Sequence, residues 1–225
     1  MRRQKSTSLA LLFAALLMLA PAKSEAQVAG GGSGPGTELK QPVVLYDEDP
    51  ADPKGRQYSG SVVWRVEPVT TAAGQQDVAV QGDIEVPDRK LKLKMTLQRN
   101  FDRTLPASHA IELGFKLPPD FVGGGIGNIP GVLMKSSEQA RGTPLSGLAV
   151  KVVDGFFLFG LSNVGNAPAS NLDLLRNRAW IDIPLVYLDR HRAILMVEKS
   201  NEVFQTAITA WERASPPAPV TGNKP

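Results

Sequence analysis

Residues 90–98 have the sequence KLKLKMTLQ, and this stretch decides the fold class. Leucine and methionine alternate strictly with lysine, threonine and glutamine, so the pattern has a period of two residues. That period is typical of a β-strand with one buried face and one face in water. We therefore expect an antiparallel sheet that is solvated on one side.

The same pattern recurs on both sides of this stretch. It appears in residues 61–67, 77–86 and 110–117. Four later segments are more continuously apolar, which favours central strands: residues 148–153, 156–161, 180–187 and 193–198. Short polar breaks predict hairpin turns at residues 87–89, 154–155 and 189–191.

Two helices complete the expected fold. We predict a short helix around residues 170–178 and a longer one over residues 201–213, where apolar residues recur at three- and four-residue spacing. About eight or nine strands, a short helix and a C-terminal amphipathic helix indicate a mainly β protein. The expected architecture is an antiparallel β-sandwich.

The N-terminus predicts export. Three basic residues precede an unbroken apolar run over residues 9–20, and Ser24 and Ala26 place small residues where a signal peptidase recognises them. The run spans about 18 Å as a helix, short of the roughly 30 Å hydrocarbon core. We therefore expect a cleaved signal peptide over residues 1–26, no transmembrane segment after cleavage, and a periplasmic or secreted protein.

Composition divides the remainder into three parts. Residues 27–40 are rich in glycine and predict a flexible linker, whereas residues 214–225 form a proline-rich tail that we expect to be disordered. Residues 41–213 contain no second linker and no internal repeat. We expect them to form a single β-sandwich domain.

Charge and cysteine content exclude several classes of function. Arg2, Arg3, Lys5 and Lys23 against Glu25 account for the net charge of +3, so the mature chain is formally neutral. A neutral chain lacks the basic surface typical of nucleic-acid binding, so we predict no nucleic-acid partner. The absence of cysteine excludes disulfides, thiolate metal sites and a thiol nucleophile.

Residues 123–131, GGGIGNIPG, form a conspicuous glycine-rich segment. No Gly-Lys-Ser/Thr follows, and the third glycine of a GxGxxG motif is missing, so the segment does not predict a nucleotide site. We expect a surface loop instead. Gly124, Gly125, Ile126 and Asn128 are candidate ligand-binding residues in it.

The lysines within residues 90–98 form a second candidate surface. Lys90, Lys92 and Lys94 lie on the wet face of one predicted strand, where they can meet an anionic envelope component or the acidic surface of a protein partner. The alternative is that these lysines keep the edge of a sheet soluble.

The sequence offers no catalytic motif, so we predict no catalytic residue, no cofactor and no metal site. Its only histidines are His109 and His191, which we expect in solvated turns, and a histidine-based metal site usually has three protein ligands. A Ser/His/Asp arrangement around His191 and Asp189 lacks a G-x-S-x-G motif. An envelope hydrolase with a non-motif active site, using these groups and Asp182, is the alternative function.

Residues 47–52, DEDPAD, concentrate carboxylates that could hold calcium. Ala51 stands where an EF-hand has its third ligand, so the segment is not an EF-hand loop. The alternative is a solvated acidic turn.

Several stretches carry a resemblance to known proteins. They are VVLYDEDP (43–50), SGSVVWRVE (59–67), LPPDF (117–121), GNIPGVLMK (127–135) and RAILMVEK (192–199). Over about residues 41–211 the chain resembles an uncharacterised family of exported alphaproteobacterial proteins, mostly rhizobial, and residues 180–211 are similar to the invasion-associated locus B proteins. The resemblance implies a periplasmic or secreted setting and brings no catalytic residues. Together these observations favour a non-enzymatic exported protein that binds an envelope component or a protein partner.

Overall fold

The computed structural model describes residues 39–49, 51–71, 74–102 and 104–214. These residues belong to one compact unit. The expected signal peptide over residues 1–26, nearly all of the linker and nearly all of the tail lie outside the described residues. No helix among the described residues is long and apolar enough to span a membrane.

Most of the described residues lie in strands. The strands are β1 (Lys40–Asp49), β2 (Asp52–Thr70), β3 (Gln76–Val86), β4 (Leu91–Arg99), β5 (Ala107–Lys116), β6 (Ile126–Asn128), β7 (Leu133–Lys135), β8 (Thr143–Pro144), β9 (Gly147–Val153), β10 (Phe156–Ser162), β11 (Trp180–Tyr187) and β12 (Arg192–Glu198). The helical elements are the 3-10 turn η1 (Pro87–Arg89) and the helices α1 (Ala167–Asn177) and α2 (Asn201–Arg213).

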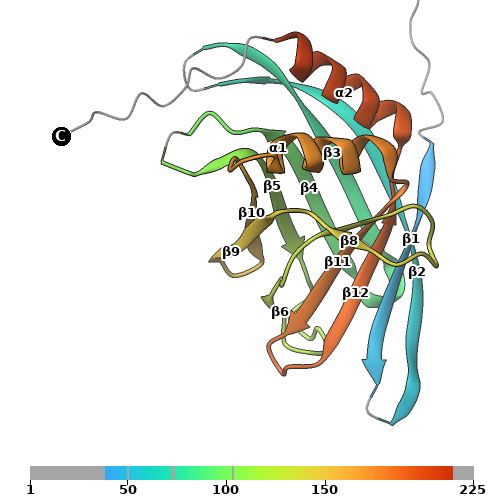
Figure 1. Cartoon of the computed structure of the whole chain (residues 1–225). Helices are drawn as coiled ribbons and strands as arrows, with labels where there is room; N and C mark the ends of the chain where they lie inside the picture. The colour runs from blue at the N-terminus through green and yellow to red at the C-terminus, as the bar shows by residue number, and fades with distance from the viewer. Residues whose placement is uncertain (1–38, 50, 72–73, 103, 215–225) are drawn as a thin grey trace, which may run out of the picture. The chain divides into compact units, whose positions relative to one another are not determined.

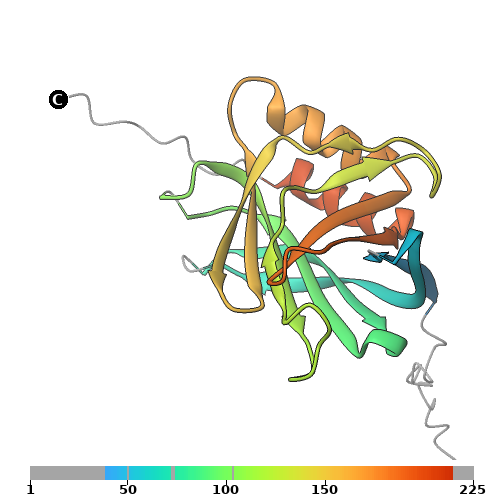
Figure 2. The ribbon, with the colours of Figure 1, turned by 90° about the horizontal axis from the view of Figure 1, so that it is seen from below.

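The strands form one antiparallel sheet in the order β8-β7-β11-β12-β1-β2-β3-β4-β5-β10-β9, with β6 also paired to β11 (Figure 1). The sheet curls into a half-barrel, and the view from below shows its strands bending around the two helices (Figure 2). Helix α2 packs on β2, β3 and α1, while α1 packs on β10. The concave face therefore holds the hydrophobic core.

The expected mainly β, antiparallel chain is confirmed, but the β-sandwich of eight or nine strands is not. One sheet of twelve strands curls over its own core instead of facing a second sheet. A strand buries one face in either architecture, so the period of two is the same in both. Strand β1 was not predicted, and β6, β7 and β8 are too short to show a period.

The local elements agree better with the sequence pattern. The three expected hairpins join β3 to β4, β9 to β10 and β11 to β12. Helix α2 has the predicted bounds because Ser200 caps it and accepts a hydrogen bond from the Val203 amide. Helix α1 begins at Ala167, three residues earlier than expected.

Trp64 of β2 is the centre of the contact between the sheet and α2. Its ring lies over Gly82, its cross-strand partner in β3, and meets the ring of Phe204 edge to face at 5.1 Å. The Trp64 indole also donates a 2.9 Å hydrogen bond to the carbonyl of Glu198. Glycine is required at position 82, because a Cβ there would lie 2.5 Å from the tryptophan ring.

The two outermost strands of the sheet, β8 and β9, are consecutive in the chain, and Leu145 and Ser146 join them. Asn171 of α1 contacts the backbone at this junction. Its side-chain oxygen accepts from the Ser146 amide, and its nitrogen donates to the Ser146 carbonyl, both at 2.8 Å. The buried Asn171 side chain thus satisfies the Ser146 amide and shares the Ser146 carbonyl with the Ser162 amide of β10, which donates to it at 2.9 Å.

Replacement of Gly82 by alanine should lower the free energy of unfolding by about 1–3 kcal/mol, because the added methyl displaces the Trp64 ring. Chemical denaturation measures the effect. Gly114 in β5 is the matched control, since a Cβ at this strand position meets its nearest atom at 3.7 Å. Equal effects of the two substitutions would show that the tryptophan contact does not determine stability.

Candidate functional site

The lysines within residues 90–98 face solvent on the convex side of β4. Lys92 and Lys94 are exposed, whereas the apolar residues that alternate with them are buried. Lys92 forms a 2.9 Å ion pair with Glu85, and Lys90 occupies a left-handed conformation (φ 49°) at the end of η1. Because β4 is an interior strand between β3 and β5, these lysines do not protect a sheet edge.

The glycine-rich loop lies against the end of β11. Gly123, Gly124 and Gly125 all have positive φ angles, of 101°, 75° and 130°, which side chains disfavour. A Cβ at Gly123 would lie 2.7 Å from the Tyr187 ring, so the loop approaches this ring as closely as a glycine permits. The backbone of the loop accepts a 3.0 Å hydrogen bond from the Leu188 amide at Gly125.

The candidate residues of this loop differ in accessibility. Ile126 is 3 % exposed and contributes to the core, as do Phe121 and Ile129. Gly124 and Asn128 are exposed. The buried apolar residues of the loop therefore contribute to the core, while Gly124, Asn128 and Pro130 meet solvent.

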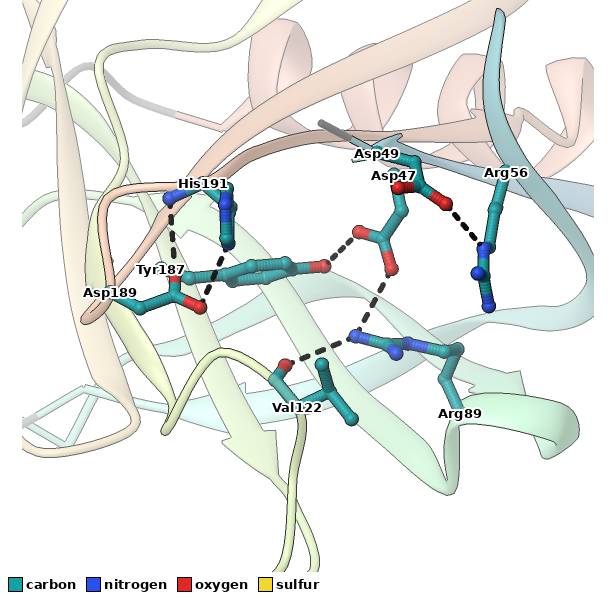
Figure 3. Close-up of polar contacts among 8 residues, drawn as sticks. All are labelled: Asp47, Asp49, Arg56, Arg89, Val122, Tyr187, Asp189 and His191. Carbon is teal, nitrogen blue, oxygen red and sulfur yellow. Dashed lines mark hydrogen bonds and ion pairs between the residues drawn. The ribbon is translucent and has the colours of Figure 1, made fainter. Parts of the chain in front are cut away.

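A buried polar network holds this loop, and the sequence did not predict it (Figure 3). The Tyr187 hydroxyl donates a 2.5 Å hydrogen bond to one oxygen of Asp47, and Arg89 lies 3.0 Å from the other oxygen. Arg89 also donates to the carbonyl of Val122 at 3.2 Å. The network therefore connects β1, η1, the glycine-rich loop and β11.

Aromatic rings enclose the guanidinium group of this network. Arg89 lies over the rings of Phe121 and Tyr58, with its guanidinium carbon 4.8 and 5.3 Å from their centroids. Burial raises the pKa of Tyr187, and its hydrogen bond to the Asp47 carboxyl adds to the shift. The neutral phenol therefore stays a donor at physiological pH. These groups bond to one another, so we assign the network a structural role.

Tyr187→Phe should lower the free energy of unfolding by about 1–3 kcal/mol, because it leaves a buried oxygen of Asp47 without its donor. Hydrogen exchange should also become faster in residues 121–125. Tyr46→Phe is the control, because Tyr46 is only half-buried and lies 3.5 Å from its partner Glu138. Unchanged exchange in the loop of the Tyr187 variant would contradict this role.

The described carboxylates of the acidic segment make contacts with other parts of the chain. Asp47 belongs to the buried network, and Asp49 pairs with Arg56 at 2.7 Å (Figure 3). Asp52 accepts from the Lys54 amide at 2.9 Å and so shapes the β1–β2 turn. Across the residues that the structure describes, no group of three or more His, Asp or Glu side chains is placed to hold a metal ion.

The two histidines occupy different environments. His191 is exposed in the β11–β12 turn, as expected, with its Nδ1 2.9 Å from Asp189 (Figure 3). The expectation of a solvated turn is wrong for His109, which is 6 % exposed in β5 because its ring packs against Trp211. Burial lowers the pKa of His109 to about 4, and the nearby Arg99 adds to this effect.

The depressed pKa of His109 predicts a loss of stability in acid. As the pH falls from about 6.5 to about 4, the unfolded chain binds a proton that the folded chain does not, so the free energy of unfolding falls by up to about 3 kcal/mol. His109→Gln should remove this contribution, measured by chemical denaturation across that pH range. His191→Gln is the control and should keep it; identical pH profiles for the two variants would exclude His109 as the cause.

Asp182, the remaining group of the alternative hydrolase, is buried beside a lysine. Its carboxylate lies 3.3 Å from the ammonium group of Lys135 on β7, and that ammonium also contacts the sulfur of Met196 at 3.3 Å. Burial raises the pKa of Asp182, while the Lys135 charge opposes the shift. This pair joins β7 to β11 and does not include His191.

Three grooves on the described surface have neither histidine in their lining. One of about 400 Å³ lies between the β1–β2 turn and β12, and its lining includes Tyr46, Asp49 and Arg192. Another, of about 340 Å³, adjoins it across Ile194 and is largely apolar, with Pro130 in its wall. These grooves therefore give no support to histidine catalysis.

The edge strand β9 is an exposed apolar surface that the sequence did not assign to a site. Residues 148–153 were expected in a central strand, but β9 ends the sheet and pairs only with β10. Leu148, Val150, Val152 and Val153 are 72, 52, 53 and 61 % exposed. The prediction was wrong because apolar composition does not show how many strands pair with a segment.

Comparison of this chain with protein-family models, with curated proteins and with solved structures finds no match.

Proposed function

We propose that this protein is an exported, non-enzymatic binding protein of the cell envelope, and that it takes a protein partner on the open edge of its sheet at β9. The observation that carries the proposal is the exposure of four aliphatic side chains on this one strand. A cluster of this kind is typical of an interaction surface.

The backbone of β9 supports binding by strand addition. The Ser162 amide donates to the Ser146 carbonyl, which fixes the alternation of hydrogen bonds between β10 and β9. By that alternation, Leu148 and Val150 direct their backbone groups toward β10, whereas Ala149 and Lys151 direct theirs outward. An extended segment of a partner can pair with these outward groups, while the exposed aliphatic side chains add apolar contacts.

The chain interrupts this edge at one place, around Lys151 and Val152. Edge strands are usually protected by charged residues, by proline or by shortness. The opposite edge, β8, follows that rule with two residues and Pro144. In β9 the protection is limited to Lys151, which is exposed and paired with Asp154 at 2.8 Å, and to a bulge at Val152, where the register with β10 shifts.

Export and the second surface rest on sequence patterns. The basic and apolar leader and the resemblance to exported alphaproteobacterial proteins support a periplasmic or secreted location. Lys92 and Lys94, exposed together on the convex face, support a separate contact with an anionic envelope component. The candidate groups of the hydrolase alternative lie apart: His109 is buried in β5, Asp182 pairs with Lys135, and His191 contacts Asp189 in an exposed turn.

A photo-crosslinking residue at position 150 tests the binding surface in cells. Illumination should give a protein adduct at Val150 and little or none at Val164, a control residue of the same type that is 73 % exposed in the loop before α1. Val164 has the same residue type and is more exposed than Val150, so non-specific labelling would modify both positions. Equal labelling, or no adduct at either position, would overturn the proposal.

A further inference from the structure

We infer that the partner of β9 is a second copy of this chain, paired antiparallel about a twofold axis at Val150. The inference rests on the proposed function and names its partner. Self-pairing of one strand requires that the same surface be complementary to itself. Backbone groups, charge and apolar side chains of β9 each meet this requirement.

The outward backbone groups of β9 match under a twofold axis at Val150. This axis places Ala149 of one copy opposite Lys151 of the other, and these are the residues whose backbone groups point away from β10. Each copy thus supplies the donors and acceptors that the other lacks. Val150 then faces Val150, in a pair without backbone hydrogen bonds, where side chains approach most closely.

Charge also favours this register. An axis at Lys151 would place two lysines directly opposite each other, which is unfavourable. With the axis at Val150, each lysine faces an alanine and keeps its own partner Asp154, 2.8 Å away. No like charges are then opposed across the new ladder.

The apolar surface continues from β9 onto β10, which increases the area available for burial. Val150 is the cross-strand partner of Leu158, and Val153 that of Phe156, and both β10 residues are half-buried. The convex face near the axis is therefore aliphatic and aromatic. Two such faces side by side would remove exposed apolar surface from water in both copies.

The inferred assembly closes as a dimer because each chain has one edge suited to pairing. Strand β8 is two residues long and contains Pro144, which has no backbone donor. A second pairing through that edge would be needed to build a fibre. A twofold contact at β9 uses the available edge and ends the assembly.

Disulfide trapping tests the axis directly, because the chain has no cysteine of its own. In the purified mature protein, Val150→Cys should form a disulfide-linked dimer under mild oxidation. Val164→Cys is the matched control: it also introduces the only thiol of the chain, at a more exposed position, and it should give far less disulfide-linked dimer. Without oxidant, Val150→Lys should weaken the dimer about tenfold or more in sedimentation equilibrium, equivalent to about 1.4 kcal/mol, and Val164→Lys should leave it unchanged.

The outcomes separate this inference from the proposed function. A monomeric wild-type protein, with equal trapping at positions 150 and 164, overturns the second copy as partner. If the adduct at Val150 in cells then has the mass of this chain plus a different protein, strand addition at β9 still holds with another partner. If no adduct forms, both proposals fail. Circular dichroism of each variant checks that a loss of dimer does not arise from unfolding.

Discussion

The contact of Trp64 with Gly82 and Phe204 is the constraint on which the rest of the structure depends. A single antiparallel sheet has one apolar face to bury, and in this protein no second sheet covers it. The sheet must curl, and something must close the concave side. The Trp64 ring can lie flat on β3 because residue 82 has no side chain, and the same ring then receives Phe204 from α2. Curvature of the sheet and docking of the helix are therefore set by one cluster of side chains.

At two places where strands end, buried polar side chains form hydrogen bonds that join segments distant in the sequence. Near α1, Asn171 bonds to both backbone groups of Ser146 where β8 and β9 diverge. At the end of the sheet away from α2, Asp47 and Arg89 meet Tyr187 beneath the glycine-rich loop (Figure 3). A buried polar group is costly unless it is bonded, so each set stabilises the fold only while all its members are present.

Local sequence patterns predicted most of the longer strands and the C-terminal helix, but they did not predict how these elements pack together. The alternation in residues 90–98 became β4 (Leu91–Arg99), and helical spacing after Ser200 became α2. Asp47 and Tyr187 are 140 positions apart, and no periodicity relates such residues. The acidic segment suggested a calcium site because its composition gives no sign that Asp47 points inward. The placement of β9 failed for the same reason, since strand order depends on pairing between distant segments.

The exposed residues of the interior strand β4 differ from those of the edge strand β9. Where β4 faces water in the middle of the sheet, the exposed positions are lysines. Where β9 faces water at the edge, with its backbone also unpaired on one side, four exposed positions are leucine and valine, and the one exposed charge is that of Lys151, which pairs with Asp154. The edge is the more hazardous place for apolar residues, because an open ladder recruits other strands. A chain that solubilises an interior strand and leaves its edge apolar supports the proposal that this edge is covered when the protein functions.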